Sequence, residues 1–171
     1  MELFQEKGYE GTTVEEISQR AGLTQRTFFR YFADKREVFF AGSEEFGLAV
    51  AAKVESSDEA DPLARVVGAF ESVAAALFDN RAEAVRQRTA IVASSPELQE
   101  REVHKLGKIV AQVAEVLVTQ GQTPALAQFV SELGVLVFRS SFAVWAARQT
   151  EETLAATIRS TLGQLRTLVH R

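Results

Sequence analysis

Cysteine is absent from this chain of 171 residues, and histidine and proline are scarce, with two and three residues. Without cysteine the chain forms neither a disulfide framework nor a thiolate metal site. The two histidines are not spaced with acidic residues in the manner of a zinc site. The glycines do not form a phosphate-binding loop after a strand. These absences argue against an enzyme and against a metal ion or other cofactor.

Long apolar runs are also missing. No uninterrupted stretch of about 18 apolar residues occurs, which argues against an ordinary membrane span. The first ten residues contain acids and lack the apolar centre of a signal peptide. The formal net charge is −4, with 19 Lys and Arg against 23 Asp and Glu, which favours solubility. We therefore expect a cytoplasmic protein with no membrane partner.

Apolar residues recur at helical spacing along most of the chain, and no alternating strand pattern of convincing length occurs. Each of the three prolines suits the first turn of a helix. Beyond residue 45, the pattern predicts helices at about 62–78, 82–93, 96–120, 124–148 and 151–169. The sequence therefore predicts an all-α fold.

Two short helices joined by a tight turn are predicted near the N-terminus. The first runs from about Val14 to Arg20, and Gly22 ends it because glycine takes the left-handed cap conformation without a steric penalty. Thr24 caps the second helix, Gln25 to Tyr31, and a third helix begins after Asp34. This arrangement is typical of a helix-turn-helix motif, in which the second helix enters the major groove of DNA.

Positive charge is concentrated around this motif. Residues 17–40 contain five Lys and Arg but only two acids, whereas the rest of the chain is acidic. Gln25, Arg26, Thr27 and Arg30 lie at or near the start of the second helix, and Gln and Arg can make bidentate contacts to adenine and guanine. The alternative interpretation is an ordinary solvated face on a core helix.

The segment resembles the DNA-binding domain of TetR-family transcriptional regulators over about the first 45 residues. The residues in matching places are Phe4, Gly8, Tyr9, Thr12, Thr13, Val14, Ile17, Ala21, Gly22, Leu23, Thr24, Thr27, Phe28, Tyr31, Phe32, Lys35 and Val38. The resemblance implies an N-terminal helix-turn-helix domain, residues 1–45, followed by a helical ligand-binding and dimerisation domain, residues 46–171.

The resemblance and the side-chain chemistry together give candidate DNA contacts. For base or groove contact we expect Gln25, Arg26 and Arg30. For phosphate contact we expect Thr13, Thr24, Thr27, Tyr31 and Lys35. The family usually has a tyrosine where this chain has Phe29, so one phosphate contact through a hydroxyl is lost.

The last two helices are predicted to form a homodimer. Helix 124–148 carries two apolar stripes on different sides, and helix 151–169 carries one. A helix that is apolar over so much of its circumference is buried on more than one side. A four-helix bundle with a second copy, which the TetR resemblance implies, would bury these stripes. The alternative is a single monomeric core.

A small-molecule effector is a further implication of the resemblance, because regulators of this family bind ligands in a cavity among the central helices. Candidate lining residues are Phe70, Phe78, Arg88, Phe138, Phe142 and Trp145. For each apolar one the alternative role is core packing, and Arg88 is the candidate to orient an anionic or carbonyl-bearing compound.

These observations predict a repressor that binds a palindromic double-stranded operator as a dimer and is released by an effector. The alternative is a helical small-molecule-binding or scaffold protein without DNA binding, because the family's first helix usually begins further upstream than it does here.

Overall fold

The computed structural model describes residues 1–78, 81–147 and 152–169, and every regular element in these ranges is a helix. The helices are α1 (Glu2–Lys7), α2 (Val14–Arg20), α3 (Gln25–Tyr31), α4 (Lys35–Phe39), α5 (Ser43–Glu55), α6 (Pro62–Leu77), α7 (Ala82–Ser94), α8 (Pro96–Thr119), α9 (Pro124–Ala147) and α10 (Leu154–Val169). The all-α prediction is confirmed.

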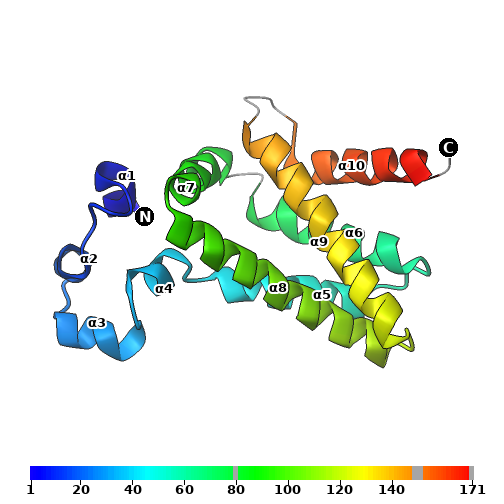
Figure 1. Cartoon of the computed structure of the whole chain (residues 1–171), viewed down its shortest axis with the longest axis horizontal. Helices are drawn as coiled ribbons and strands as arrows, with labels where there is room; N and C mark the ends of the chain where they lie inside the picture. Colours follow the sequence, from blue (N-terminus) through cyan, green and yellow to red (C-terminus); the bar gives the residue numbers. More distant parts are fainter. Residues whose placement is uncertain (79–80, 148–151, 170–171) are drawn as a thin grey trace.

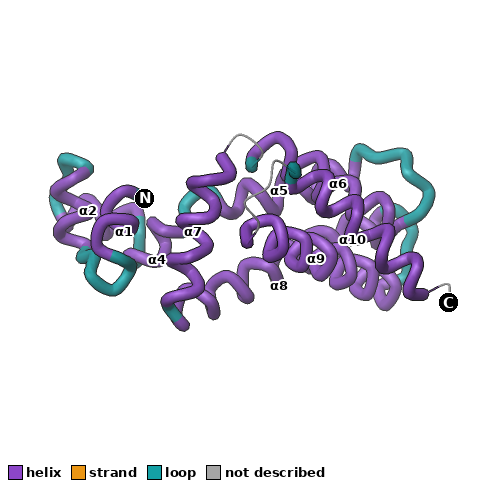
Figure 2. The backbone as a smooth tube through the Cα atoms, turned by 90° about the horizontal axis from the view of Figure 1, so that it is seen from above, coloured by secondary structure: helices purple, strands orange, loops and turns teal. Residues whose placement is uncertain are grey.

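The helices form two groups along the length of the molecule. Helices α1–α4 lie at one end, and α5, α6, α8, α9 and α10 form a larger bundle at the other, with the two termini at opposite ends (Figure 1). The view from above shows the same separation and only helices and loops (Figure 2). The short helices are therefore held away from the bundle, joined to it through α5, α7 and the start of α8.

The larger bundle has a continuous apolar core in which the helices approach closely. Val66 and Phe70 of α6 are fully buried against α9. Gly134 makes this approach possible, because a Cβ built there would lie only 2.3 Å from Cγ1 of Val66. Gly47 acts similarly between α5 and α8, where a Cβ would lie 2.6 Å from Oε1 of Gln112. Packing at this density leaves little freedom for larger side chains at these positions.

A second, smaller core joins the short N-terminal helices to the bundle. Its buried members are Phe4, Tyr9, Phe39, Phe40 and Leu98, with Ile17, Ile91 and Val92 packed against them. Residues of α7 and α8 belong to this core, so the core of the N-terminal helices is shared with the bundle. The boundary expected after residue 45 falls inside α5, which runs from Ser43 to Glu55.

Several predicted helix limits agree with the structure and a few differ. Gly22 ends α2 as predicted, with φ 67°, and Gly121 follows α8 with φ 94°. Helix α5 begins at Ser43, and its cap position is taken by Gly42 in the left-handed conformation. Helix α10 begins at Leu154, later than predicted. The predicted boundaries at residues 148 and 151 lie outside the described residues.

Helix α9 is long and apolar enough to cross a membrane if judged by length and composition alone. However, 44% of its most apolar window is buried inside the protein, where it packs against α6, α8 and α10. Such burial is typical of a central helix in a bundle that is apolar on several sides. The absence of a membrane partner stays a prediction.

Candidate nucleic-acid interface

The start of α2 is fixed by a capping box. The Thr13 hydroxyl accepts a hydrogen bond from the Glu16 backbone N–H at 3.2 Å, and Glu16 Oε2 accepts one from the Thr13 N–H at 2.9 Å. Lys7 donates to Glu16 Oε1 at 2.5 Å. Because Lys7 and then Thr13 donate to the carboxylate, the pKa of Glu16 falls to about 2. The first turn of α2 is therefore stabilised both by hydrogen bonds to its backbone and by the ion pair between Lys7 and Glu16.

The turn between α2 and α3 is built as the sequence predicts. Gly22 has φ 67°, and the Leu23 N–H donates to the Ser18 carbonyl at 2.9 Å, which closes the end of α2. Thr24 then caps α3, accepting from the Thr27 N–H at 3.1 Å. The two helices pack against each other. The helix-turn-helix prediction is confirmed.

Helix α3 buries one side and exposes the other. Phe28 is buried, whereas Gln25, Arg26 and Arg30 are exposed and Tyr31 has 63% of its surface accessible. The residues predicted to touch bases therefore lie in one helix on a surface that other parts of the described chain do not cover. A helix with this composition, free on one side, is available to enter a groove.

Two of the cations near the motif are neutralised within the protein. Arg20 lies 3.2 Å from a carboxylate oxygen of Glu6. Arg36 lies 2.6 Å from Asp34 and 2.9 Å from Glu97 of α8. These ion pairs brace the motif and link it to the bundle, so neither arginine is a free point of contact.

Lys35 is also occupied inside the protein. Its ammonium donates to the Tyr9 carbonyl at 2.9 Å and to the Thr12 carbonyl at 3.3 Å, and it lies 4.2 Å from the centroid of the Tyr9 ring. Lys35, which the sequence predicts at a phosphate, thus links the start of α4 to the turn after α1. Two of its three N–H donors therefore have acceptors inside the protein, and its contact with a phosphate stays a prediction.

Arg26 and Arg30 differ from these cations. Arg26 makes no hydrogen bond or ion pair with the described residues. Arg30 pairs with no carboxylate among them, and donates instead to the Tyr31 hydroxyl at 2.9 Å with its guanidinium 4.7 Å from the Tyr31 ring centroid. Both lie on the exposed side of α3. The positive charge that remains available around the motif is therefore on the helix predicted to read DNA.

The three threonine hydroxyls predicted for phosphate are not equivalent. The Thr13 hydroxyl donates to Glu16 at 3.0 Å, so its hydrogen is committed. The Thr24 and Thr27 hydroxyls lie 3.0 Å apart, and one donates to the other. One hydroxyl hydrogen of this pair is left to donate to a phosphate oxygen.

Phe29 is an exposed aromatic on the same helix, with 55% of its surface accessible and its ring edge-on to Phe28 at 5.3 Å. It lies beside Arg30 and Tyr31 in the sequence, and it offers apolar contact in place of the tyrosine hydroxyl of the family pattern. Apolar contact to the thymine methyl group is one way in which such a side chain reads a base.

The aromatic residues predicted to line an effector cavity contact one another. Phe70 stacks on Phe138 at 4.9 Å between centroids, Phe138 lies 5.8 Å from Phe142, and Phe142 lies 5.9 Å from both Phe78 and Trp145. The indole N–H of Trp145 donates to the backbone carbonyl of residue 152 at 3.0 Å. In this conformation the rings fill the space between α6 and α9.

Arg88 lies away from these aromatic residues. Its guanidinium is 5.1 Å from the ring centroid of Phe39 and 5.0 Å from that of Phe40, and it pairs with Glu102 of α8 at 3.4 Å. The expectation that Arg88 shares a cavity with the aromatic set does not match this placement. Helix α7 contacts both cores, and Arg88 faces the smaller one, as Ile91 and Val92 do.

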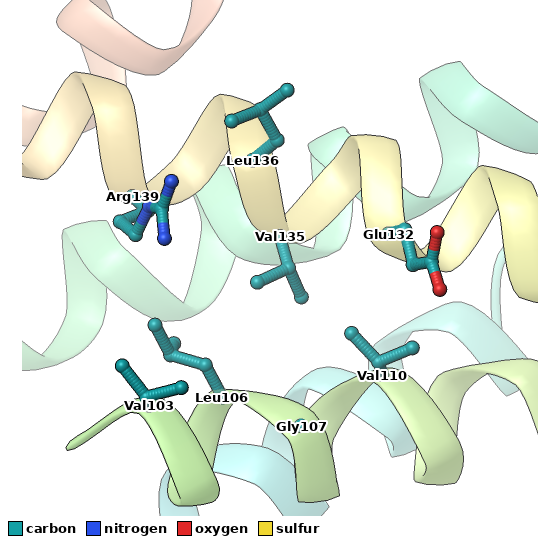
Figure 3. Close-up of a pocket in the computed structure, with 8 residues that line it drawn as sticks. All are labelled: Val103, Leu106, Gly107, Val110, Glu132, Val135, Leu136 and Arg139. Carbon is teal, nitrogen blue, oxygen red and sulfur yellow. The ribbon is translucent and has the colours of Figure 1, made fainter. Parts of the chain in front are cut away.

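The structure holds an open groove elsewhere, between α8 and α9, with a volume of about 310 Å³ (Figure 3). Its lining residues are Val103, Leu106, Gly107, Val110, Glu132, Val135, Leu136 and Arg139. Figure 3 shows Val135 of α9 pointing toward Leu106 and Val110 of α8, whereas Leu136 points away from α8. Glu132 and Arg139 lie on either side of Val135 along α9. None of the predicted effector residues lines this groove. Among the described residues, no group of three His, Asp or Glu side chains is placed to hold a metal ion.

Comparison with known proteins gives the same result as the motif. Residues 1–41 match the family model described as bacterial regulatory proteins, tetR family. The HTH-type transcriptional regulator TcmR of Streptomyces glaucescens is 38% identical over 86 residues, which make up 50% of this chain. The match spans 38% of the length of that regulator.

Solved structures resemble the chain along nearly its whole length. A Mesorhizobium loti MAFF303099 protein described as a TetR-family transcriptional regulator has a TM-score of 0.60 at 19% identity, covering 99% of this chain and 90% of that one. A TerR/AcrR-family regulator from Aquifex aeolicus VF5 has a TM-score of 0.57 at 23% identity, covering 98% and 93%. At these identities the likeness shows a shared fold.

The motif and the fold define a helix-turn-helix protein with a helical C-terminal bundle. Its N-terminal residues match the TetR family, and its described helices have the fold of TetR-family structures. The resemblance to the TetR family therefore covers the N-terminal 41 residues in sequence and the described helices in fold.

Proposed function

We propose that this protein binds double-stranded DNA through α3 as a homodimer and represses transcription until a small-molecule effector releases it from a palindromic operator. One observation carries the DNA-binding part. Arg26 and Arg30 have no carboxylate partner among the described residues and are exposed on α3, whereas Arg20, Lys35 and Arg36 are occupied inside the protein. A net charge of −4 makes this local surplus a distinct feature of the surface.

Within this proposal the α3 side chains have separate roles. Gln25, Arg26 and Arg30 contact base edges, because their planar amide or guanidinium groups match adenine and guanine. Tyr31 and the free hydroxyl hydrogen of the Thr24–Thr27 pair contact phosphates. The regulation of transcription is supported by the match of residues 1–41 to the tetR family model and by the description of TcmR as a transcriptional regulator.

The homodimer is supported by an uncovered apolar surface on α9. Phe129 is 58% exposed, Leu136 46% and Val144 41%, and their spacing places them on one side of the helix. On α10, Gly163 faces open space, since a Cβ there would meet nothing within 4 Å. A second copy packed on this surface would bury it, and twofold pairing would bring two α3 helices to successive major grooves.

The effector part of the proposal rests on the resemblance to the TetR family and on two places where a ligand could bind. The first is the cluster of aromatic rings between α6 and α9, which would have to separate to admit a flat apolar molecule. The second is the groove between α8 and α9, whose volume of about 310 Å³ is at the lower end of ligand pockets. An effector must bind the DNA-free conformation more tightly than the DNA-bound one, because equal affinity shifts no population.

Selection from a library of random duplexes by gel shift tests this function. We expect enrichment of an inverted repeat whose half-sites are one helical turn apart, about 10 base pairs centre to centre, bound by two protomers. Failure to enrich any sequence, with only weak salt-sensitive binding to all duplexes, would reject the regulator and favour a helical small-molecule-binding or scaffold protein.

A further inference from the structure

A small basic pocket lies where the end of α4 and the start of α5 meet α8, apart from both the recognition helix and the groove of Figure 3. Its volume is about 20 Å³, and it is lined by Phe40, Ser43, Glu44, Arg101, His104, Lys105 and Lys108. Four of these residues belong to α8, namely Arg101, His104, Lys105 and Lys108. The last three follow Arg101 by three, four and seven positions, so all four lie on one side of the helix. The pocket thus concentrates cationic and imidazole groups from a single helix against the α4–α5 corner.

Most of the charge in this pocket is not neutralised by the protein. Lys108 lies 3.4 Å from the one lining carboxylate, Glu44, so these two charges offset each other. Arg101, His104 and Lys105 make no hydrogen bond or ion pair with the described residues, and the Ser43 hydroxyl likewise makes none. Several donors therefore face the pocket without an acceptor, in a chain that carries a net charge of −4.

Lys105 also lies near an aromatic ring of the pocket lining. It is partly buried, its ammonium is 6.0 Å from the Phe40 ring centroid, and no oxygen of the described residues accepts its hydrogen bonds. Burial lowers the pKa of Lys105, Arg88 lowers it further, and Glu102 opposes both. Taking an ammonium out of water without giving it an acceptor costs free energy. A bound anion would supply both the acceptor and the opposite charge.

We propose that this pocket binds a small oxyanion, namely the phosphate or carboxylate group of a small molecule. Arg101 offers a planar fork of donors suited to two oxygens, Lys105 a point charge, and Ser43 a hydroxyl from the start of α5. A volume of about 20 Å³ admits roughly one water-sized atom, so one oxygen enters while the remainder stays at the mouth. The inference does not depend on DNA binding or on the effector proposal.

Occupancy would have a structural consequence. The pocket joins α8 to the corner that connects α4 with α5, and the N-terminal helices reach the bundle largely through this corner and the smaller core. An oxyanion held by Arg101 and Ser43 together would strengthen that connection. The bound state therefore stabilises the attachment of the helix-turn-helix unit, by mass action of the ligand on the folded form.

Calorimetric titration and thermal unfolding with inorganic phosphate test the proposal at constant pH and ionic strength, with sodium chloride as the reference salt. The full chain is compared with Arg101→Gln and Lys105→Met, and with Lys53→Gln as the control. Lys53 is an exposed lysine on α5, outside both pockets, and its side chain has no partner among the described residues. We expect phosphate to bind and to raise Tm, at least tenfold weaker binding in both pocket variants, and unchanged binding in the control.

Three results would overturn the proposal. Equal effects of phosphate and chloride would show only a response to ionic strength. Equal loss in Arg101→Gln and Lys53→Gln would show diffuse attraction rather than a site, and this comparison remains decisive even if Lys105→Met fails to fold. Displacement of bound phosphate by short duplexes of random sequence would assign the cations to the DNA backbone instead of to a small molecule.

Discussion

The Lys35 ammonium donates to the backbone carbonyl of Tyr9 at 2.9 Å and also lies 4.2 Å from the centroid of the Tyr9 ring. This double contact ties the start of α4 to the turn that follows α1. It explains how a short helix-turn-helix unit keeps its geometry although its core is shared with α7 and α8. Lys35 thus belongs with the cations that stabilise the motif, whereas Arg26 and Arg30 are exposed and have no carboxylate partner among the described residues.

The first prediction follows from this separation. Lys35→Met should lower the free energy of unfolding by about 2 kcal/mol, because charged hydrogen bonds and a cation–π contact are lost while the aliphatic stem remains. Urea denaturation measures the change, and Arg26→Met is the control that should leave stability within about 0.5 kcal/mol. If Lys35→Met unfolds at the wild-type midpoint and only weakens DNA binding, the phosphate role expected from the sequence holds instead.

Arg26 carries the second prediction. Arg26→Ala should cost about 1–3 kcal/mol in affinity for the selected operator and relax base preference at one position, if the guanidinium contacts a guanine. Lys53→Ala on α5, an exposed lysine without a side-chain partner among the described residues, is the control and should leave affinity unchanged. Gel-shift titrations at one fixed salt concentration provide the measurement, and an equal effect of the two substitutions would argue against α3 as the reading helix.

The third prediction concerns the dimer. Leu136→Glu should produce monomers that remain folded, because this residue is 46% exposed in the protomer and a charge is costly only when a second copy covers it. Leu48→Glu on α5, at 58% exposure, is the control and should not change assembly. Sedimentation velocity with circular dichroism distinguishes dissociation from unfolding. A wild-type protein that is monomeric at micromolar concentration would remove the dimer altogether.

A fourth prediction uses two helical glycines. Gly134→Ala should destabilise the protein by about 1–3 kcal/mol, because its Cβ would meet the buried Val66 side chain and separate α6 from α9. Gly68→Ala on α6 faces open space and should stabilise it by about 0.5–1 kcal/mol through helix propensity. Denaturation midpoints of the two variants should therefore move in opposite directions, and movement in the same direction would contradict the close approach.

The fifth prediction is a pH dependence. The pKa of Glu16 is lowered to about 2 in the folded protein from an ordinary value of 4.5, so the deprotonated form is favoured by folding. Its contribution to stability is fully present above pH 4.5 and is lost as the pH falls toward 2. Glu16→Gln should flatten the change of unfolding free energy in this window. An unchanged slope between pH 5 and 3 would show that the Lys7 and Thr13 contacts do not act on Glu16 as described.

The sequence by itself determined the local structure of the N-terminal motif. Thr13, Gly22 and Thr24 specify caps and a turn through their own side chains or backbone freedom, so contacts within a few residues are sufficient. The same holds for the helical class of the rest of the chain, because apolar spacing reports the helix period directly. The family pattern is likewise read from residues in linear order.

Only the tertiary structure decided how long-range partners are paired. Lys35 contacts the Tyr9 carbonyl and Arg88 lies over the Phe40 ring, and the linear spacing links neither pair. The contact of Lys35 with a phosphate stays a prediction. The unpaired state of Arg26 and the unpartnered donors around Lys105 are also properties of what surrounds each residue in space. A lysine or arginine side chain can pair with a carboxylate, a carbonyl or an aromatic ring, and the sequence does not specify which. The packing of α1, α7 and α8 determines which of these groups lies within its reach.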